Sequence, residues 1–233
     1  MRSMLKDTIN GLDKILFVEI PKGSVILVTG AEGTLKSGLV FSMMTNHIAA
    51  NDEHALYVTL EQNGESHLRN MNSLGIKKES DLHIFDYRDM RLEWMNSELD
   101  LIKMTEEVIE SYKDKYDNLT LFALDSLNAL YSISEHENMR SKIYNFFTRL
   151  REEGITSFLI MESAPSRVGV QFSQFHQTEH FLADGTIELG MIEGMGGVKR
   201  YIQILKMRAT KHAMEKHQLT IDENGISIRG PIY

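Results

Sequence analysis

The segment between Val25 and Gly38 constrains this chain more than any other. It reads VILVTGAEGTLKSG: an apolar, β-branched run, then a loop containing glycines, then Lys36-Ser37 at the start of a helical pattern. A strand, a glycine-bearing loop and a helix N-terminus in this order are typical of a phosphate-binding loop. A glycine-rich turn that binds nothing is the alternative, but such a turn requires neither lysine nor serine at fixed positions.

Physical chemistry gives each residue type in this loop a role. Glycines let backbone N–H groups turn inward around a phosphate, and the helix N-terminus adds a partial positive charge. Lys36 can reach the outer phosphates of a nucleotide, and the Ser37 hydroxyl can bind Mg²⁺. Leu35 replaces the consensus glycine before the lysine, a change expected to bear on hydrolysis more than on binding. The residues expected to contact the nucleotide here are Gly30, Gly33, Thr34, Leu35, Lys36, Ser37 and Gly38.

Composition narrows the class of protein. The 233 residues, 42% of them hydrophobic, suit one large domain over 1–233, with a lead-in at 1–24 and an antiparallel extension at 181–233. A net charge of −8 disfavours a duplex-binding protein. The absence of cysteine excludes disulfides and thiolate metal sites. With no signal peptide and no apolar run near the ~20 residues of a membrane span, we expect a soluble, cytoplasmic protein.

Predicted helices and strands alternate along most of the chain. The helical patterns cover 36–50, 63–74, 101–116 and 135–153, and the apolar strand-like runs cover 25–30, 55–60, 82–86, 119–126 and 155–162. Further strands at 181–189, 200–207, 218–221 and 226–228 alternate like antiparallel hairpins. This order predicts an α/β fold with a mostly parallel central sheet flanked by helices and a C-terminal antiparallel hairpin edge. The polar loop at 163–180 is long enough to suggest a function.

Acidic residues follow the predicted parallel strands, where ligands bind in open α/β sheets. Asp125 ends a buried run, and a Mg²⁺ ion or its waters would give this buried carboxylate a partner. Capping of the next helix is the alternative for Asp125. Glu61 is the candidate general base, which would polarise a water in line with the terminal phosphate. Its alternative is also the N-cap region of the following helix. Two further polar residues lie at the carboxyl ends of predicted parallel strands: Ser126 ends the run 119–126, and Glu162 ends the run 155–162.

A last cluster, Lys206-Met-Arg-Ala-Thr-Lys-His212, ends a predicted strand. Lys206 and Arg208 are two residues apart, so they point to the same side of that strand. Such a pair forms either a solvated face or a clamp on phosphate oxygens, and the spacing alone does not separate the two.

Taken together, these landmarks resemble the KaiC-like ATPases of the RecA superfamily. The resemblance runs in order over nearly the whole chain and corresponds to one KaiC-type domain. The matching segments are Gly11-Leu-Asp13 with Ile20-Pro-Lys-Gly23, Gly30–Ser37, Tyr57–Gln62, Leu124–Leu127, Ala183–Ile187, Ile204–His212 and Leu219–Ile226.

The resemblance implies a RecA-like P-loop NTPase fold that binds ATP and Mg²⁺ at the subunit boundaries of a homo-oligomeric ring, usually a hexamer. It implies that Glu61 is catalytic, that Ser37 and Asp125 hold the metal, and that Ser73 contacts the nucleoside. It also implies that one segment reaches the nucleotide of the neighbouring subunit, with Lys206 and Arg208 on its γ-phosphate. That segment contributes Lys206, Met207, Arg208, Thr210 and His212.

The chain departs from the family pattern at three places, and the first two leave the function open between two classes. The three places are Leu35, Gln62 in place of a second glutamate, and Phe17-Val-Glu19 in place of a glycine pair. The leading prediction is a slow, Mg²⁺-dependent ATPase. The alternative is a nucleotide-held scaffold that hydrolyses little. A RecA-like DNA-binding paralogue, with loops at 127–135 and 163–180, is disfavoured by the negative charge. No protein partner can be named from the sequence.

Overall fold

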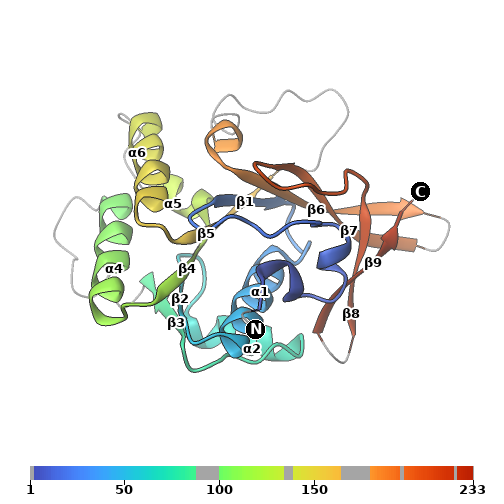
Figure 1. Cartoon of the computed structure of the whole chain (residues 1–233), viewed down its shortest axis with the longest axis horizontal. Helices are drawn as coiled ribbons and strands as arrows, with labels where there is room; N and C mark the ends of the chain where they lie inside the picture. Colours follow the sequence, from blue (N-terminus) through green and yellow to red (C-terminus); the bar gives the residue numbers. More distant parts are fainter. Residues whose placement is uncertain are drawn as a thin grey trace.

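The computed structural model describes residues 3–87, 100–133, 139–163, 179–194, 197–222 and 225–232. One nine-stranded sheet runs through these residues in the order β3-β2-β4-β5-β1-β6-β7-β8-β9 (Figure 1). The strands are β1 (Val25–Gly30), β2 (His54–Thr59), β3 (Leu82–Asp86), β4 (Leu119–Asp125), β5 (Thr156–Glu162), β6 (Gly185–Gly194), β7 (Gly197–Met207), β8 (His217–Asp222) and β9 (Gly225–Pro231). Most of the predicted loop at 163–180 lies outside the described residues.

The predicted α/β class is confirmed. Six strands, β3 to β6 in spatial order, pair in parallel, and β6 to β9 pair antiparallel. Strand β6 belongs to both parts, because it pairs in parallel with β1 and antiparallel with β7. The hairpin predicted around 222–225 is the β8–β9 pair, in which Asp222 lies opposite Gly225.

Helices cover both faces of the sheet, which explains why β1, β2, β4 and β5 are buried along nearly their whole length. Helices α1 (Lys36–Ala50) and α2 (Gly64–Ser73) lie on one side, and α4 (Leu101–Lys115), α5 (Leu127–Ile133) and α6 (Met139–Glu152) lie on the other (Figure 1). Each side has its own buried hydrophobic cluster. No helix of the described ranges combines the length and the hydropathy that crossing a bilayer requires.

Two local predictions were wrong. Residues 127–133, predicted as part of a loop, form helix α5, because Leu127 and Leu130 are buried and the Ser126 hydroxyl accepts the Ala129 N–H at 3.4 Å. Residues 179–182 are helical, although 179–180 were predicted as the end of a loop and 181–182 as the start of a strand, and β6 begins only at Gly185.

The lead-in packs on the antiparallel part of the sheet. Its two short 3₁₀ helices are η1 (Leu5–Asp7) and η2 (Leu12–Lys14). Isolated bridges join Asn10 to Ser227 and Leu16 to His212. Gly11 has φ = 87°, and a Cβ there would lie 2.2 Å from the Ile228 carbonyl oxygen, so the contact requires glycine.

Candidate functional site

Strand β1 delivers the loop to the N-terminus of α1, as the sequence predicts. A Cβ on Gly30 would lie 2.2 Å from the Leu189 carbonyl oxygen and 2.8 Å from Thr34 Oγ1, so the loop can leave the sheet here only with glycine. The Thr34 hydroxyl donates to the Ala31 carbonyl at 2.7 Å and closes the turn from inside. The loop is therefore closed by a hydrogen bond of its own.

Lys36 crosses this loop rather than pointing away from it. Its side chain is 7% exposed, and its ammonium donates to the Ala31 carbonyl at 2.9 Å. The same nitrogen lies 3.8 Å from Glu162 Oε1 at the end of β5. Burial lowers the pKa of Lys36, and the nearby carboxylates of Glu162 and Asp125 partly offset this effect.

Leu35 occupies a backbone conformation that favours glycine. Its φ of 76° and ψ of 27° lie in the left-handed region, where a side chain costs about 1–2 kcal/mol. The leucine side chain is half-buried against the core beside α1. The loop thus keeps a conformation that the consensus glycine would adopt easily, and carries the associated strain.

The sheet register brings the predicted acids to one edge. Thr59 of β2 lies opposite Asp125 of β4, Asp125 lies opposite Ile160 of β5, and Gly30 lies opposite Glu162. A cavity of ≈ 260 Å³ opens at this edge. Its lining includes Gly33, Leu35, Lys36, Ser37, Gly38, Glu61, Gln62, Asp125 and Ser126. The structure therefore brings together the loop, the candidate base and the candidate metal-side acid.

Asp125 is held by the site rather than by the following helix. It is 7% exposed, and the Tyr57 hydroxyl donates to its Oδ2 at 2.6 Å. Burial raises the pKa of Asp125, while hydrogen bonds from Tyr57 and Ser37 act in the opposite direction. Because Ser126 supplies the hydroxyl at the start of α5, the N-cap alternative for Asp125 is not observed.

Glu61 is likewise not a helix cap. The N-cap of α2 is Asn63, whose Oδ1 accepts the Ser66 N–H at 2.8 Å. The exposed Glu61 carboxylate instead accepts a hydrogen bond from the Ser126 hydroxyl, directly after Asp125. The candidate base is thus hydrogen-bonded to the residue that directly follows the candidate metal-side acid.

The charge of the cavity limits what it can bind unaided. Its lining has one cationic side chain, Lys36, against the four carboxylates of Glu32, Glu61, Asp125 and Glu162, a formal charge of −3 among the described lining residues. The described residues contain no group of three or more His, Asp or Glu that could hold a metal ion by themselves. A hydroxyl and one nearby carboxylate suit Mg²⁺, which keeps waters and takes its other ligands from phosphates.

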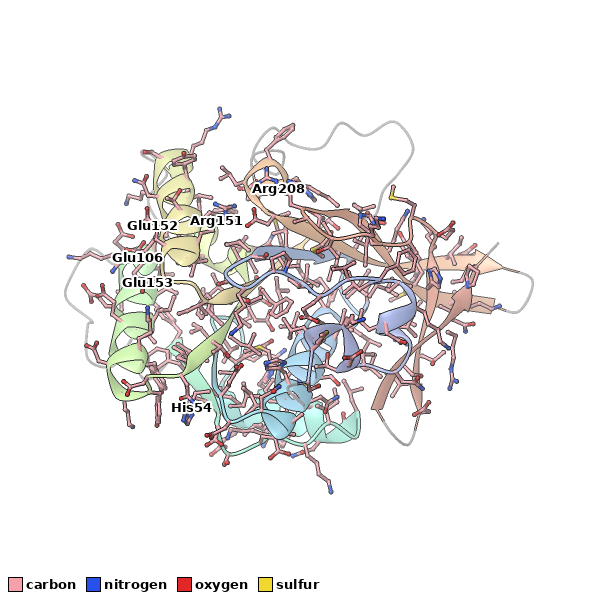
Figure 2. All side chains as sticks on the ribbon, in the orientation of Figure 1. His54, Glu106, Arg151, Glu152, Glu153 and Arg208 are labelled. Atoms are coloured by element: carbon pink, nitrogen blue, oxygen red, sulfur yellow. The ribbon has the colours of Figure 1, made fainter. Side chains whose placement is uncertain are left out.

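Gly30 and Thr34 of the loop are not among the described lining residues of this cavity, and neither are six predicted residues from outside the loop. Ser73, at the end of α2, donates its hydroxyl to the Asn70 carbonyl, and Met207 is buried against Gly185. The Thr210 hydroxyl donates to the Glu19 carbonyl, and His212 Nδ1 lies 2.9 Å from the Ala213 carbonyl oxygen. Arg208 lies just past the end of β7, near Arg151 of α6 (Figure 2).

Lys206, the sixth, also lies away from the cavity lining. Its ammonium donates to the carbonyls of His180 at 3.1 Å and Ala183 at 2.5 Å. Arg208 contacts the same segment through Phe181 and Asp184, so the two cations face one side as predicted. Neither cation is among the described lining residues of the cavity beside the phosphate loop.

Comparison with known proteins places this geometry in a family. A family profile described as "ATPase: KaiC" matches residues 5–232. The chain belongs to the KaiC ATPase family. It is 28% identical to the circadian clock oscillator protein KaiC of Picosynechococcus sp. over 96% of this chain, and 29% identical to that of Rippkaea orientalis. The chain spans 44% and 43% of those two relatives, less than half of their length.

A solved structure agrees over the whole length. The KaiC-like protein from Pyrococcus horikoshii OT3 superposes with a TM-score of 0.76 at 26% identity, covering 98% of both chains. The RecA-like fold of the KaiC family, expected from the motifs, is therefore confirmed.

This KaiC-family chain also has a cavity residue that sequence reasoning missed. His67 of α2 is 2% exposed and lines the cavity. Its ring lies 4.6 Å from that of Tyr57 and 5.1 Å from that of Phe41, centroid to centroid. Among the described residues its Nε2 has no hydrogen-bond partner. Only the helical pattern of α2 could have pointed to its burial, and nothing in the sequence indicated the missing partner.

His67 should make this KaiC-family protein sensitive to acid. Burial lowers its pKa from 6.5 to about 4. Between these values the unfolded chain binds a proton that the folded chain does not, so stability falls as pH falls. We expect this histidine to cost the fold up to ~3 kcal/mol between pH 7 and pH 4. Urea unfolding of His67→Leu should show a shallower loss across that range, and a pH slope equal to wild type would contradict the assignment.

Proposed function

We propose that residues 1–233 act as one ATPase domain that binds Mg·ATP between protomers of a ring-shaped homo-oligomer and hydrolyses it slowly. The observation that carries this proposal is the convergence of Lys36, Ser37, Glu61 and Asp125 on one cavity at the carboxyl ends of parallel strands. Membership of the KaiC ATPase family supports the same conclusion.

Each residue has a definite task in this scheme. The loop N–H groups and Lys36 hold the phosphates, with the partial positive charge of the α1 N-terminus behind them. Ser37 and Asp125 hold Mg²⁺, which supplies positive charge to the β- and γ-phosphate oxygens. Glu61 accepts the proton of the attacking water. The Ser126 hydroxyl keeps the Glu61 carboxylate at the cavity edge.

The proposed oligomer explains the charge of the cavity. A triphosphate entering a cavity of formal charge −3 needs more cations than Lys36 and one Mg²⁺ provide. Lys206 and Arg208 lie outside the cavity of their own subunit. In a closed ring, a repeated head-to-tail contact would bring them to the phosphates of the neighbour. A hexamer is the ring size that the family resemblance suggests.

A nucleotide-held scaffold is the second candidate. Leu35, whose backbone is in the left-handed conformation, introduces a side chain where the loop would approach a phosphate. Gln62 contributes an amide rather than a second carboxylate to the cavity. Gln62 accepts a hydrogen bond from Asn70 at 2.9 Å, which ties it to α2. DNA binding has less support, because the segment at 127–133 is helical and the chain has a net charge of −8.

Titration calorimetry with Mg·ATP tests the binding site. We expect wild type to bind and Lys36→Ala to bind at least tenfold more weakly, because the variant loses the only cationic side chain in the described cavity lining. Lys22→Ala, an exposed lysine two residues before Ser24, is the matched control and should bind normally. Equal affinity of wild type and Lys36→Ala would overturn the proposed site.

A further inference from the structure

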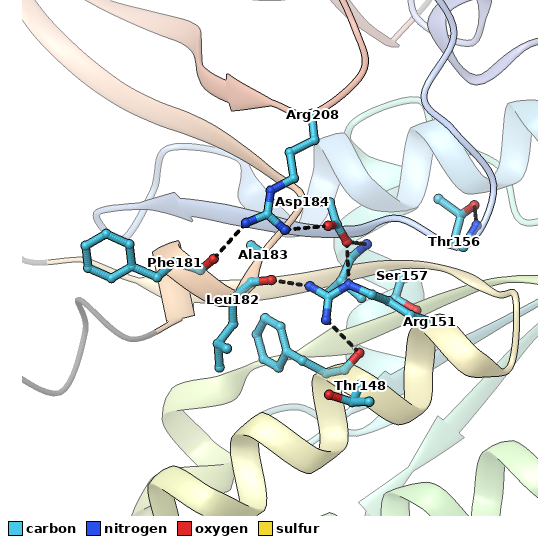
Figure 3. Close-up of polar contacts among 12 residues, drawn as sticks. Thr148, Arg151, Thr156, Ser157, Phe181, Leu182, Ala183, Asp184 and Arg208 are labelled. Carbon is cyan, nitrogen blue, oxygen red and sulfur yellow. Dashed lines mark hydrogen bonds and ion pairs between the residues drawn. The ribbon is translucent and has the colours of Figure 1, made fainter.

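Asp184 connects three elements that are far apart in the sequence (Figure 3). Its Oδ2 accepts hydrogen bonds from the Val25 N–H at 3.0 Å and from Arg151 Nε at 2.8 Å. Its Oδ1 accepts from Arg208 Nη1 at 3.0 Å. We call these four residues the Asp184 hub. It joins the start of β1, the end of α6 and the end of β7.

The main chain fixes the same partners. The Asp184 N–H donates to the Val25 carbonyl at 2.8 Å, and the Arg208 N–H donates to the Asp184 carbonyl at 2.8 Å. Asp184 therefore holds both Val25 and Arg208 through backbone and side chain together. Because the backbone bonds do not need the carboxylate, removing its charge should free the guanidinium of Arg208 without displacing its Cα.

The residues just before Asp184 offer their carbonyls to the same cations. Phe181 accepts from Arg208, Leu182 accepts from Arg151, and Ala183 accepts from Lys206 (Figure 3 shows the first two). Two of these oxygens accept from Lys206 and Arg208 at the end of β7, and the third accepts from Arg151 of α6. Lys206 and Arg208, the two cations of the proposed clamp, are thus both held by residues 181–184, which we call the platform.

This platform orients the cations without neutralising them. Arg151, Lys206 and Arg208 carry three positive charges against one negative charge on Asp184, a formal excess of +2. The Arg208 side chain is 56% exposed, and its contacts with the described residues use two of the five N–H groups of a guanidinium. The remaining donors can bind an anion that approaches from outside the subunit.

We propose that Asp184 is a positioning residue that pre-orients Arg208 for the phosphates of the neighbouring subunit's nucleotide. This inference rests on the proposed function, since it requires Arg208 to act across a subunit boundary. Through Val25, the same carboxylate also fixes the strand that leads into the subunit's own phosphate loop. Asp184 therefore contacts both the arginine that would reach the neighbour's nucleotide and the strand that leads into its own subunit's phosphate loop.

The carboxylate stays ionised at neutral pH. Burial raises the pKa of Asp184, but the Val25 N–H and the guanidinium groups of Arg151 and Arg208 outweigh it, so the pKa lies below its ordinary value. Asp184→Asn keeps the shape and removes this charge. Steady-state ATP turnover of this variant is the direct test. We expect kcat to fall at least tenfold while KM stays within about twofold, because an arginine finger acts in the transition state.

Asp100→Asn is the matched control. Asp100 also accepts backbone N–H groups and pairs with a cation, Lys142 at 2.8 Å, but it lies at the N-terminus of α4, away from the clamp. We expect it to lower the melting temperature without lowering kcat. If Asp184→Asn does not fold, Asp184→Glu, which retains the charge but shifts the carboxylate by one methylene, replaces it with the same expected outcome.

A double variant separates this inference from the proposed function. If Asp184 acts through Arg208, Asp184→Asn should reduce turnover by less than about twofold in an Arg208→Ala background. Normal or increased kcat in Asp184→Asn, with Arg208→Ala strongly impaired, would overturn the positioning role alone. Normal kcat in Arg208→Ala would overturn the trans clamp itself. A full loss in both backgrounds would show that Asp184 acts through the fold rather than through Arg208.

Discussion

Replacing Glu61 by Gln is expected to lower Mg·ATP turnover by roughly 10²–10⁴-fold while leaving Mg·ATP affinity nearly unchanged. The substitution keeps the side-chain volume and can still bond to the Ser126 hydroxyl, which now donates to Glu61. Only the ability to accept the proton of the attacking water is lost. Phosphate release by the purified variant, compared with wild type at saturating Mg·ATP, measures the effect.

Glu65→Gln provides the control for this experiment. Glu65 is an exposed glutamate in the first turn of α2 and is not part of the cavity lining, so its variant should turn over at the wild-type rate. If Glu61→Gln hydrolyses ATP as fast as wild type, the base has been assigned to the wrong residue. If wild type itself binds Mg·ATP but releases no phosphate, the scaffold function is the correct one.

Arg208→Ala is expected to reduce turnover by roughly 10³-fold or more, as removal of an arginine finger does in other phosphoryl-transfer enzymes. Its own phosphate loop should still bind nucleotide, since Arg208 is not part of that cavity. Mixing Arg208→Ala with Lys36→Ala subunits should restore activity. An intact site forms wherever the phosphate loop of an Arg208→Ala subunit meets Arg208 of a Lys36→Ala subunit. Random mixing makes about a quarter of the interfaces of this kind.

The control mixture pairs Arg208→Ala with the double variant Lys36→Ala/Arg208→Ala, which offers no arginine and should restore nothing. Light scattering establishes that both mixtures form oligomers of the same size. If the first mixture is no more active than the second, Arg208 does not act across the boundary. A protein that remains monomeric with and without nucleotide would exclude the trans arrangement altogether.

The parts of this molecule that could be predicted from the sequence are those whose physics is local. The strand, loop and helix around Lys36 need only apolar residues, glycines and a helix start within fourteen consecutive residues, Val25–Gly38. The convergence of Glu61 and Asp125 on one edge was predictable because parallel strands share their carboxyl ends. The antiparallel edge followed from alternation and from the turn at Asp222-Glu-Asn-Gly225.

What could not be predicted depends on partners distant in the chain. Tyr57 and Asp125 are 68 residues apart, and Val25 and Asp184 are 159 apart, so no sequence window contains either pair. The helical turn at 179–182 depends on such contacts, because its carbonyls accept from Lys206, Arg208 and Arg151. Helix α5 was missed because its seven residues are too few for a clear helical period.

Leu35 changes what a search for phosphate loops should look for. The motif is usually written in residue types, and by that description this chain fails at one position. Its backbone nevertheless takes φ values of 77° at Gly33 and 76° at Leu35. At position 35 a leucine therefore takes the left-handed backbone conformation that glycine adopts most easily. A search that compares loops by their backbone dihedral angles would find chains such as this one, which a search by sequence motif rejects.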